Sequence, residues 1–215
     1  FGHAPAIVDA CSMAGITRAV FVSTTSIFTK TNAASKALRE TAEGTISESG
    51  LDWTILRPTM IYGTAADRNM ARLLRFIARS PVVPLPGGGD RLQQPVHVDD
   101  LAGAVVAAFL SPRSVGVAYN IAGPDPLSLR RVVEQASIAV GRRPLMIPVP
   151  MPLALVAVGL YQRLAPRPRL TTEQIWRLAE DKAFDISTAE AELNYSPRSF
   201  VAGIGQQAEE MGLRD

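Results

Sequence analysis

Residues 19–63 read AVFVSTTSIFTKTNAASKALRETAEGTISESGLDWTILRPTMIYG, and this stretch decides the fold. An apolar run at 19–22 is followed by a turn rich in hydroxyl groups, a helical segment, and a second apolar run at 53–56. Strand, helix and strand at this spacing predict a right-handed crossover between two parallel strands. Ligands of open α/β sheets bind outside the carboxyl ends of the strands. We therefore expect the functional site at 23–26 and 57–63, where the two predicted strands end.

The same stretch resembles the NAD-dependent epimerase/dehydratase family, a branch of the extended and atypical short-chain dehydrogenase/reductases. That family places a serine or threonine after one strand, a Tyr-x-x-x-Lys pair on the next helix, and an Arg-Pro-x-x-x-Tyr-Gly run after the second strand. Thr25 matches the hydroxyl residue, Lys36 matches the lysine, and residues 57–63 match the third element. The position four residues before Lys36 holds Asn32 instead of the family tyrosine.

The resemblance implies hydride transfer at a bound NAD or NADP, with Thr25 and Lys36 as the catalytic candidates. The implied cofactor contacts are Ser23, Thr24, Lys36, Pro58, Thr59, Met60 and Ile61. The implied substrate contacts are Tyr62, Arg91 and Gln94. In the family mechanism the lysine charge lowers the tyrosine pKa from its ordinary value near ~10. Asparagine can hydrogen-bond a ligand but cannot act as a general acid, so Lys36 is expected to bind cofactor rather than to move a proton.

Each of these residues also has a simpler explanation. Lys36 can be an exposed helix lysine that pairs with Glu40 one turn later. Thr25 can satisfy the backbone of its turn, and Pro58 can serve only to end a strand. The order of the separated motifs along the chain favours the functional interpretation.

The sequence lacks a glycine-rich turn of the Gly-x-Gly-x-x-Gly type after a strand, and the cluster at 87–89 precedes no predicted helix. By resemblance, the fold class is α/β: the C-terminal part of a Rossmann-like parallel sheet with a smaller, mostly helical substrate-region subdomain. We expect a partial NAD(P)-binding domain at 1–122, with 64–96 contributing to the substrate region. The substrate-region subdomain is expected at 123–215.

Periodicity and capping residues predict the remaining elements. Helices are expected at 4–14, 33–49, 69–78, 100–111, 128–140, 152–164, 172–180, 187–193 and 200–211, and further strands at 82–85 and 117–121. The buried stripe of the helix at 33–49 is expected to be Ala34, Leu38, Ala42 and Ile46. Glu43 is expected on its surface. Asp99 is expected to cap the next helix, and His97 to have a structural role.

Composition places the chain among ordinary globular proteins: 215 residues, 47% hydrophobic and 20% charged, with a net charge of +2. That charge is too small to indicate nucleic-acid binding. The longest apolar run, 152–161, is shorter than the ~20 residues of a spanning helix, so no membrane association is expected. The single cysteine, Cys11, excludes an internal disulfide and suits a cytoplasmic setting. A small-molecule substrate and a homodimer are expected on the resemblance alone.

Three hypotheses follow for function. The first is an NAD(P)-dependent oxidoreductase of the epimerase/dehydratase type, acting on a sugar-like or small carbonyl or alcohol substrate. The second, favoured by Asn32, is an atypical member that binds a dinucleotide without catalysis or supports a larger complex. The third is a piece of a longer enzyme without activity of its own.

Overall fold

A computed structural model describes residues 2–30, 33–166 and 171–213. The chain forms two compact units, and it passes from one to the other several times. The first unit contains Phe1–Ile61, Pro95–Pro124 and Phe184–Arg198, and the second contains Tyr62–Gln94, Asp125–Ala183 and Ser199–Asp215.

A three-stranded parallel sheet forms the centre of the first unit. Its strands are β1 (Arg18–Val22), β2 (Asp52–Pro58) and β7 (Val117–Ile121), in the order β1-β2-β7. The predicted crossover is therefore confirmed, since β1 and β2 are parallel neighbours joined through a helix. β1 is an edge strand, and the described residues add no further strand beside it.

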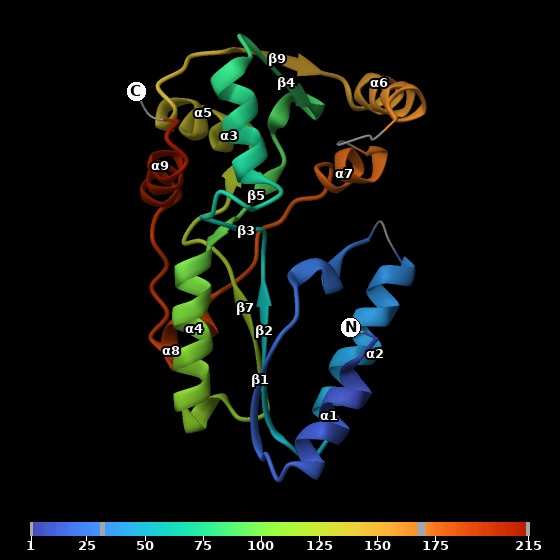
Figure 1. Ribbon diagram of the computed structural model, residues 1–215, viewed down its shortest axis with the longest axis vertical. Coiled ribbons are helices and arrows are strands. Elements are labelled where there is room, and N and C mark those ends of the chain that lie inside the picture. Colours follow the sequence, from blue (N-terminus) through green and yellow to red (C-terminus); the bar gives the residue numbers. More distant parts are fainter. Residues whose placement is uncertain (1, 31–32, 167–170, 214–215) are drawn as a thin grey trace. The chain divides into compact units, whose positions relative to one another are not determined.

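Helices cover both faces of this sheet (Figure 1). On one face, α1 (Ala4–Met13) and α2 (Ala33–Ser47) bury Val8, Ala42 and Ile46 against Ile55. On the other, α4 (Val98–Leu110) and α8 (Ser187–Leu193) pack on Leu56 and on residues of β7. Alternate strand residues point to opposite faces, which explains why β2 reads as a continuous apolar run rather than an alternating one.

The second unit is mostly helical. Three helices pack together: α3 (Met70–Arg79), α5 (Leu129–Ala139) and α9 (Phe200–Glu210). α6 (Met151–Leu164) packs with α7 (Thr172–Arg177), and β4 (Val82–Pro86) pairs in parallel with β9 (Leu145–Val149). β5 (Leu92–Gln93) and β8 (Leu127–Ser128) form a short antiparallel pair. Of the other two short strands, β6 (Val96–His97) belongs to the first unit, and β3 (Ile61–Tyr62) stands where the chain passes from the first unit to the second.

Two expectations about local structure were wrong. Leu38 on α2 is 51% exposed, whereas Glu43 is 6% exposed, so the buried face of this helix is rotated from the expected stripe. Glu43 is buried because it pairs with Arg57. Periodicity alone treats a glutamate as a polar residue and places it on the surface. The cap of α4 is His97, whose Nδ1 accepts from the Asp99 backbone N–H at 3.3 Å, rather than Asp99 itself. The side chain of Ala34 lies outside the described residues.

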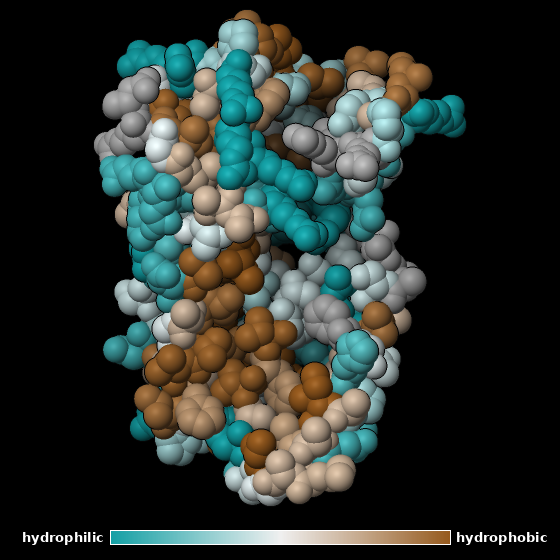
Figure 2. Space-filling model, viewed as in Figure 1, coloured by the Kyte–Doolittle hydropathy of each residue, from teal (hydrophilic) through white to brown (hydrophobic). Residues whose placement is uncertain are grey.

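Apolar side chains gather on the surface of α4, as Figure 2 shows. Val106, Phe109 and Leu110 are each more than half exposed. Among residues 2–30, 33–166 and 171–213, no helix has both the length and the apolar character needed to cross a membrane.

Candidate functional site

The hydroxyl-rich turn after β1 is tied to the end of β2. The Ser23 backbone N–H donates to the Leu56 carbonyl at 2.7 Å, which extends the ladder between the strands. Thr24 caps a short 3₁₀ helix, Thr25–Phe28, by accepting from the Ser26 N–H. The Thr25 hydroxyl is buried and donates to the Pro58 carbonyl at 3.3 Å. The turn therefore holds three hydroxyl groups in fixed places at the carboxyl edge of the sheet.

A buried ion pair joins α2 to this edge. The Glu43 carboxylate lies 3.0 Å from Arg57 Nε and 2.5 Å from Arg57 Nη2, and it accepts from the Ser23 hydroxyl at 2.5 Å. The Arg57 guanidinium also lies over the Phe28 ring, 5.4 Å from its centroid. A bidentate, nearly dry pair of this kind fixes the geometry of the groups around it. One carboxylate thereby connects both strand ends with the helix between them.

Sequence reasoning missed Glu43. An arginine at the end of a buried strand needs an acceptor, and the acid 14 residues earlier on the intervening helix supplies it. That requirement is the signal that could have identified Glu43.

The predicted lysine is half-buried on α2. The Lys36 ammonium is 3.7 Å from the Glu40 carboxylate, and the Lys36 side chain is 38% exposed. An exposed pair of this spacing contributes about 0.2–0.5 kcal/mol. This is the geometry of the simpler explanation given above, and the cofactor role of Lys36 stays a prediction. Asn32, the substitute for the family tyrosine, lies outside the described residues.

The predicted cofactor contacts at 58–61 lie at the carboxyl end of β2. Pro58 is buried, and the Thr59 N–H donates to the Ile121 carbonyl of β7 at 3.0 Å. The Met60 carbonyl accepts from the Val96 N–H at 3.0 Å, and Ile61 is 37% exposed. The structure thus brings Ser23, Thr24, Thr25 and residues 58–61 to one edge of one sheet.

The three predicted substrate contacts belong to the second unit. Tyr62 is 1% exposed and its ring lies 5.3 Å from that of Phe200. Arg91 is exposed and pairs with Asp181 at 3.0 Å, while Gln94 is 3% exposed. Their contact with a substrate stays a prediction.

The sequence analysis did not identify Lys182, a half-buried lysine that contacts Gln93. Lys182 Nζ donates to the Arg177 carbonyl at 2.5 Å and to Gln93 Oε1 at 3.4 Å. Burial lowers the Lys182 pKa to about 8, and the Arg177 charge adds to that lowering while Glu180 opposes it. Gln93 is 2% exposed, and its Nε2 has no hydrogen-bond acceptor among the described residues.

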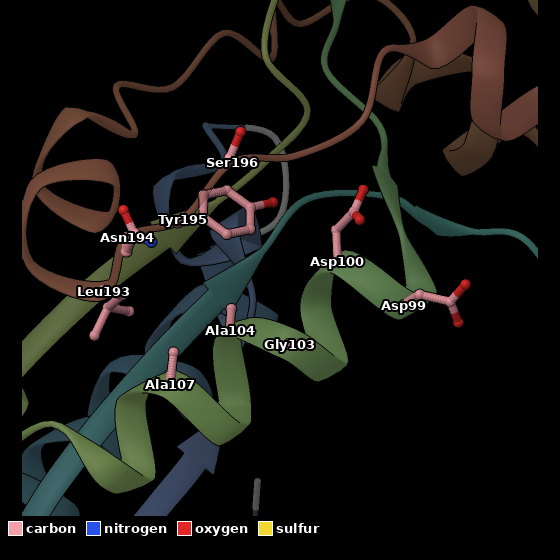
Figure 3. A pocket seen from close by; sticks show the side chains of 9 residues that line it. All are labelled: Asp99, Asp100, Gly103, Ala104, Ala107, Leu193, Asn194, Tyr195 and Ser196. Carbon is pink, nitrogen blue, oxygen red and sulfur yellow. The ribbon is translucent and has the colours of Figure 1, made fainter.

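An open pocket of about 250 Å³ lies elsewhere in the first unit, between α4 and the segment after α8 (Figure 3). Asp99 and Asp100 stand at one end of it, and both are paired with Arg198. The Tyr195 hydroxyl donates to the Ala122 carbonyl at 2.8 Å. No predicted site residue lines this pocket, so it is distinct from the strand-end site.

The strand-end groups suit the nicotinamide and ribose half of a dinucleotide. The hydroxyls of Ser23, Thr24 and Thr25 each already donate once. A hydroxyl oxygen also has two lone pairs that can accept. Ribose hydroxyls and a carboxamide NH₂ are donors of the kind such acceptors bind. The half-buried Thr24 and Ser26 and the partly exposed residues 59–61 lie where a parallel sheet binds its ligands.

Comparison with known proteins identifies the family. A family model described as NAD(P)H-binding matches residues 2–112, which is more than half of the chain. The chain therefore belongs to this NAD(P)H-binding family, and NAD or NADP is confirmed as its class of cofactor. The predicted α/β class and the predicted family are confirmed with it.

Individual relatives show the same relationship. The chain is 34% identical over 102 residues to subunit 9 of the NADH dehydrogenase [ubiquinone] 1 alpha subcomplex of Arabidopsis thaliana, a match covering 47% of this chain and 25% of that protein. It is 28% identical over 192 residues to 2-alkyl-3-oxoalkanoate reductase of Stenotrophomonas maltophilia, covering 78% of this chain and 58% of the reductase. The chain thus spans well under two thirds of either relative.

The fold is shared with solved structures of NAD-dependent enzymes. A dTDP-glucose 4,6-dehydratase from Bacillus anthracis, crystallised with NAD, superposes with a TM-score of 0.71 at 16% identity. The superposition covers 97% of this chain and 66% of the dehydratase. At this identity, the match establishes the fold alone, and any reaction has to be argued from the residues of the site.

Proposed function

We propose that this protein is an NAD(P)-dependent oxidoreductase that transfers hydride between the nicotinamide and a small carbonyl or alcohol substrate. The observation that carries the proposal is the strand-end site. There the Glu43–Arg57 pair fixes α2 and both strand ends around a turn of hydroxyl groups. Such preorganisation holds polar groups where a bound cofactor meets its substrate, so little reorganisation is needed during reaction.

Within this proposal, Ser23, Thr24 and residues 58–61 contact the nicotinamide and ribose. Thr25 acts through position, since its hydroxyl already donates to the Pro58 carbonyl and holds the turn against β2. The cofactor supplies the hydride, and these residues bind and orient it. Tyr62, Arg91 and Gln94 are proposed as substrate contacts. A cytoplasmic location is proposed as well.

The substrate class proposed is a small carbonyl compound rather than a nucleotide-sugar. The resemblance implies an arginine at the position of Gln94 in family members that use nucleotide-sugars. A neutral amide binds a diphosphate poorly. The relative from Stenotrophomonas maltophilia, named for its 3-oxoalkanoate substrates, supports the same choice.

The test is a calorimetric titration of the purified protein with NADH and NADPH, followed by an assay of NAD(P)H oxidation with ketones, aldehydes and 3-oxo acids. Binding together with oxidation that depends on one carbonyl class supports the proposal. Absence of cofactor binding to the folded protein contradicts it.

A second candidate function is cofactor binding without catalysis. The specific observation in its favour is Asn32, which cannot donate a proton as a general acid. Tight NAD(P)H binding with no turnover across the carbonyl panel would favour this candidate over the oxidoreductase.

A further inference from the structure

Hydrogen bonds to the main chain hold Lys182 beside strand β5 in the second unit. The Lys182 N–H donates to the Leu92 carbonyl at 2.9 Å, and the Leu92 N–H donates to Asp181 Oδ1 at 2.9 Å. β5 is fixed in turn by its antiparallel pairing with β8, where Gln93 lies opposite Leu127. The Lys182 and Gln93 side chains therefore start from backbone positions that the fold determines.

The Lys182 ammonium is partly desolvated and lacks a negative partner. Among the residues that the structure describes, no carboxylate forms an ion pair with it. Its two acceptors, the Arg177 carbonyl at 2.5 Å and Gln93 Oε1 at 3.4 Å, are both neutral. Burial and then the Arg177 charge lower the Lys182 pKa to about 8, while Glu180 opposes this shift. A bound anion relieves both effects, because it replaces lost hydration and offsets the Arg177 charge.

Gln93 presents a second donor at the same place. Gln93 is 2% exposed, and its Nε2 has no acceptor among the described residues. Lys182 fixes the orientation of this amide: an ammonium only donates, so the amide oxygen faces it and the NH₂ group does not. Native proteins seldom keep a buried donor without an acceptor, and a bound water or ligand is the usual explanation.

The unused donors of the two side chains are neighbours. An ammonium has three N–H groups, and Lys182 uses two of them within the described residues. The Gln93 Nε2 atom is bonded to the same carbon as Oε1, which Lys182 contacts. One charged and one neutral donor thus stand side by side, and they suit the two oxygens of a single carboxylate.

We propose that Lys182 and Gln93 bind a carboxylate, and that the substrate of this protein is a carbonyl compound that carries one. The inference rests on the proposed function where it names the substrate. Gln94, a proposed substrate contact, directly follows Gln93 in the chain, and Arg91, another, directly precedes β5. A carbonyl compound with a carboxylate is an oxo acid, so this site discriminates oxo acids from neutral ketones and aldehydes.

The test is a calorimetric titration with 3-oxobutanoate and with its methyl ester, which share the ketone and differ in charge. The titrations are run without nucleotide and with NAD⁺ or NADP⁺, which leave the ketone unreduced. They compare the wild-type protein with K182M, Q93E and R131Q. Inorganic phosphate is titrated into the wild-type protein as a third probe.

Each variant has a distinct purpose. K182M removes the ammonium. Q93E keeps the size of the side chain and gives Lys182 a counter-ion, so it favours folding while it repels a bound carboxylate. R131Q is the matched control, because Arg131 is an exposed residue of the same unit that pairs with Glu134, and its replacement also removes one positive charge.

We expect the wild-type protein and R131Q to bind 3-oxobutanoate about tenfold or more tightly than the ester, as a charge-assisted hydrogen bond predicts. K182M and Q93E should each weaken binding of the acid about tenfold or more. They should change binding of the ester less than about twofold. Both variants then lose the preference for the acid.

A preference for the acid that K182M and Q93E abolish and R131Q keeps supports the site. Equal binding of acid and ester by the wild-type protein, or a preference that survives in K182M and Q93E, overturns it. Tighter binding of inorganic phosphate than of 3-oxobutanoate overturns the choice of a carboxylate.

Oxidation of NADH or NADPH with the same two probes judges the proposed function separately. Oxidation that shows the same ratio of acid to ester in the wild-type protein and K182M contradicts this inference and leaves the oxidoreductase standing. Binding of the acid through Lys182 without any oxidation supports the carboxylate site and contradicts the proposed function for oxo acids.

Discussion

Removal of the Glu43 carboxylate is the perturbation that the structure defines most sharply. In E43Q the glutamine amide keeps the size of the side chain but loses its charge and one acceptor oxygen. Arg57 then loses its two-point contact, and the Ser23 hydroxyl competes for the remaining oxygen. The pair is largely shielded from water, with side-chain exposures of 8% for Glu43 and 22% for Arg57.

The magnitude follows from breaking a mostly buried ion pair on one side. Loss of one partner of a buried pair typically costs about 3–5 kcal/mol, and the partial exposure of Arg57 places E43Q near the lower end, at about 3 kcal/mol. The matched control is E40Q on the same helix. Its 3.7 Å pair with Lys36 is exposed, so we expect a change of less than about 0.5 kcal/mol.

Urea unfolding followed by tryptophan fluorescence measures both variants, because Trp53 lies on β2, the strand that carries Arg57. A double-mutant cycle with R57M isolates the pairwise term, for which we expect a coupling of about 2 kcal/mol. Additivity of E43Q and R57M within about 0.5 kcal/mol would refute the reasoning, since it would show that the two side chains do not stabilise each other.

Two further predictions concern backbone packing and pH. A Cβ at Gly123 would stand 2.5 Å from the Pro95 carbonyl oxygen, so G123A should destabilise the protein by about 1–3 kcal/mol. The control is G103A. No atom lies within 4 Å of the added Cβ there, so this variant should be neutral or stabilising by up to about 1 kcal/mol. Equal thermal midpoints for the two variants would contradict this packing argument. The pKa of Lys182 is about 8 in the folded protein, against 10.5 for an ordinary lysine. Between these pH values the unfolded chain binds more protons than the folded protein. This group therefore makes the free energy of unfolding rise with pH in that window, by up to about 3 kcal/mol. The measurement is the difference between wild-type and K182M unfolding curves from pH 7 to about 11, and a difference that stays constant with pH would show that Lys182 is not desolvated.

Much of the secondary structure was predictable from sequence because its signals are local. The strand expected at 117–121 is β7 with the same bounds, and the helix expected at 187–193 is α8. Thr171 forms a capping box with Gln174 at the start of α7. Apolar periodicity and capping residues lie within the element that they predict or next to it. Tertiary contacts therefore leave these elements as predicted.

The candidate site was only partly predictable, because several of its features depend on partners distant in sequence. Glu43 reads as a surface residue until Arg57 is placed beside it. His97 takes the capping position expected for Asp99, and Lys182 becomes half-buried through its contacts with Gln93 and the Arg177 carbonyl. Periodicity assigns polar residues to solvent, and only a three-dimensional contact shows which of them are paired and buried.

The sequence by itself determined the strand–helix–strand crossover, the edge at which its polar residues collect, and the family with its class of cofactor. The crossover and its polar edge follow from apolar patterning, which needs no knowledge of distant contacts. The family and its class of cofactor follow from the resemblance of short motifs to those of known proteins. Tertiary structure alone decided which face of α2 turns inward, so that Glu43 is buried and Leu38 is exposed. The physical reason is that an ion pair can replace an apolar contact in a helix–sheet interface only when its partner is supplied from the neighbouring strand.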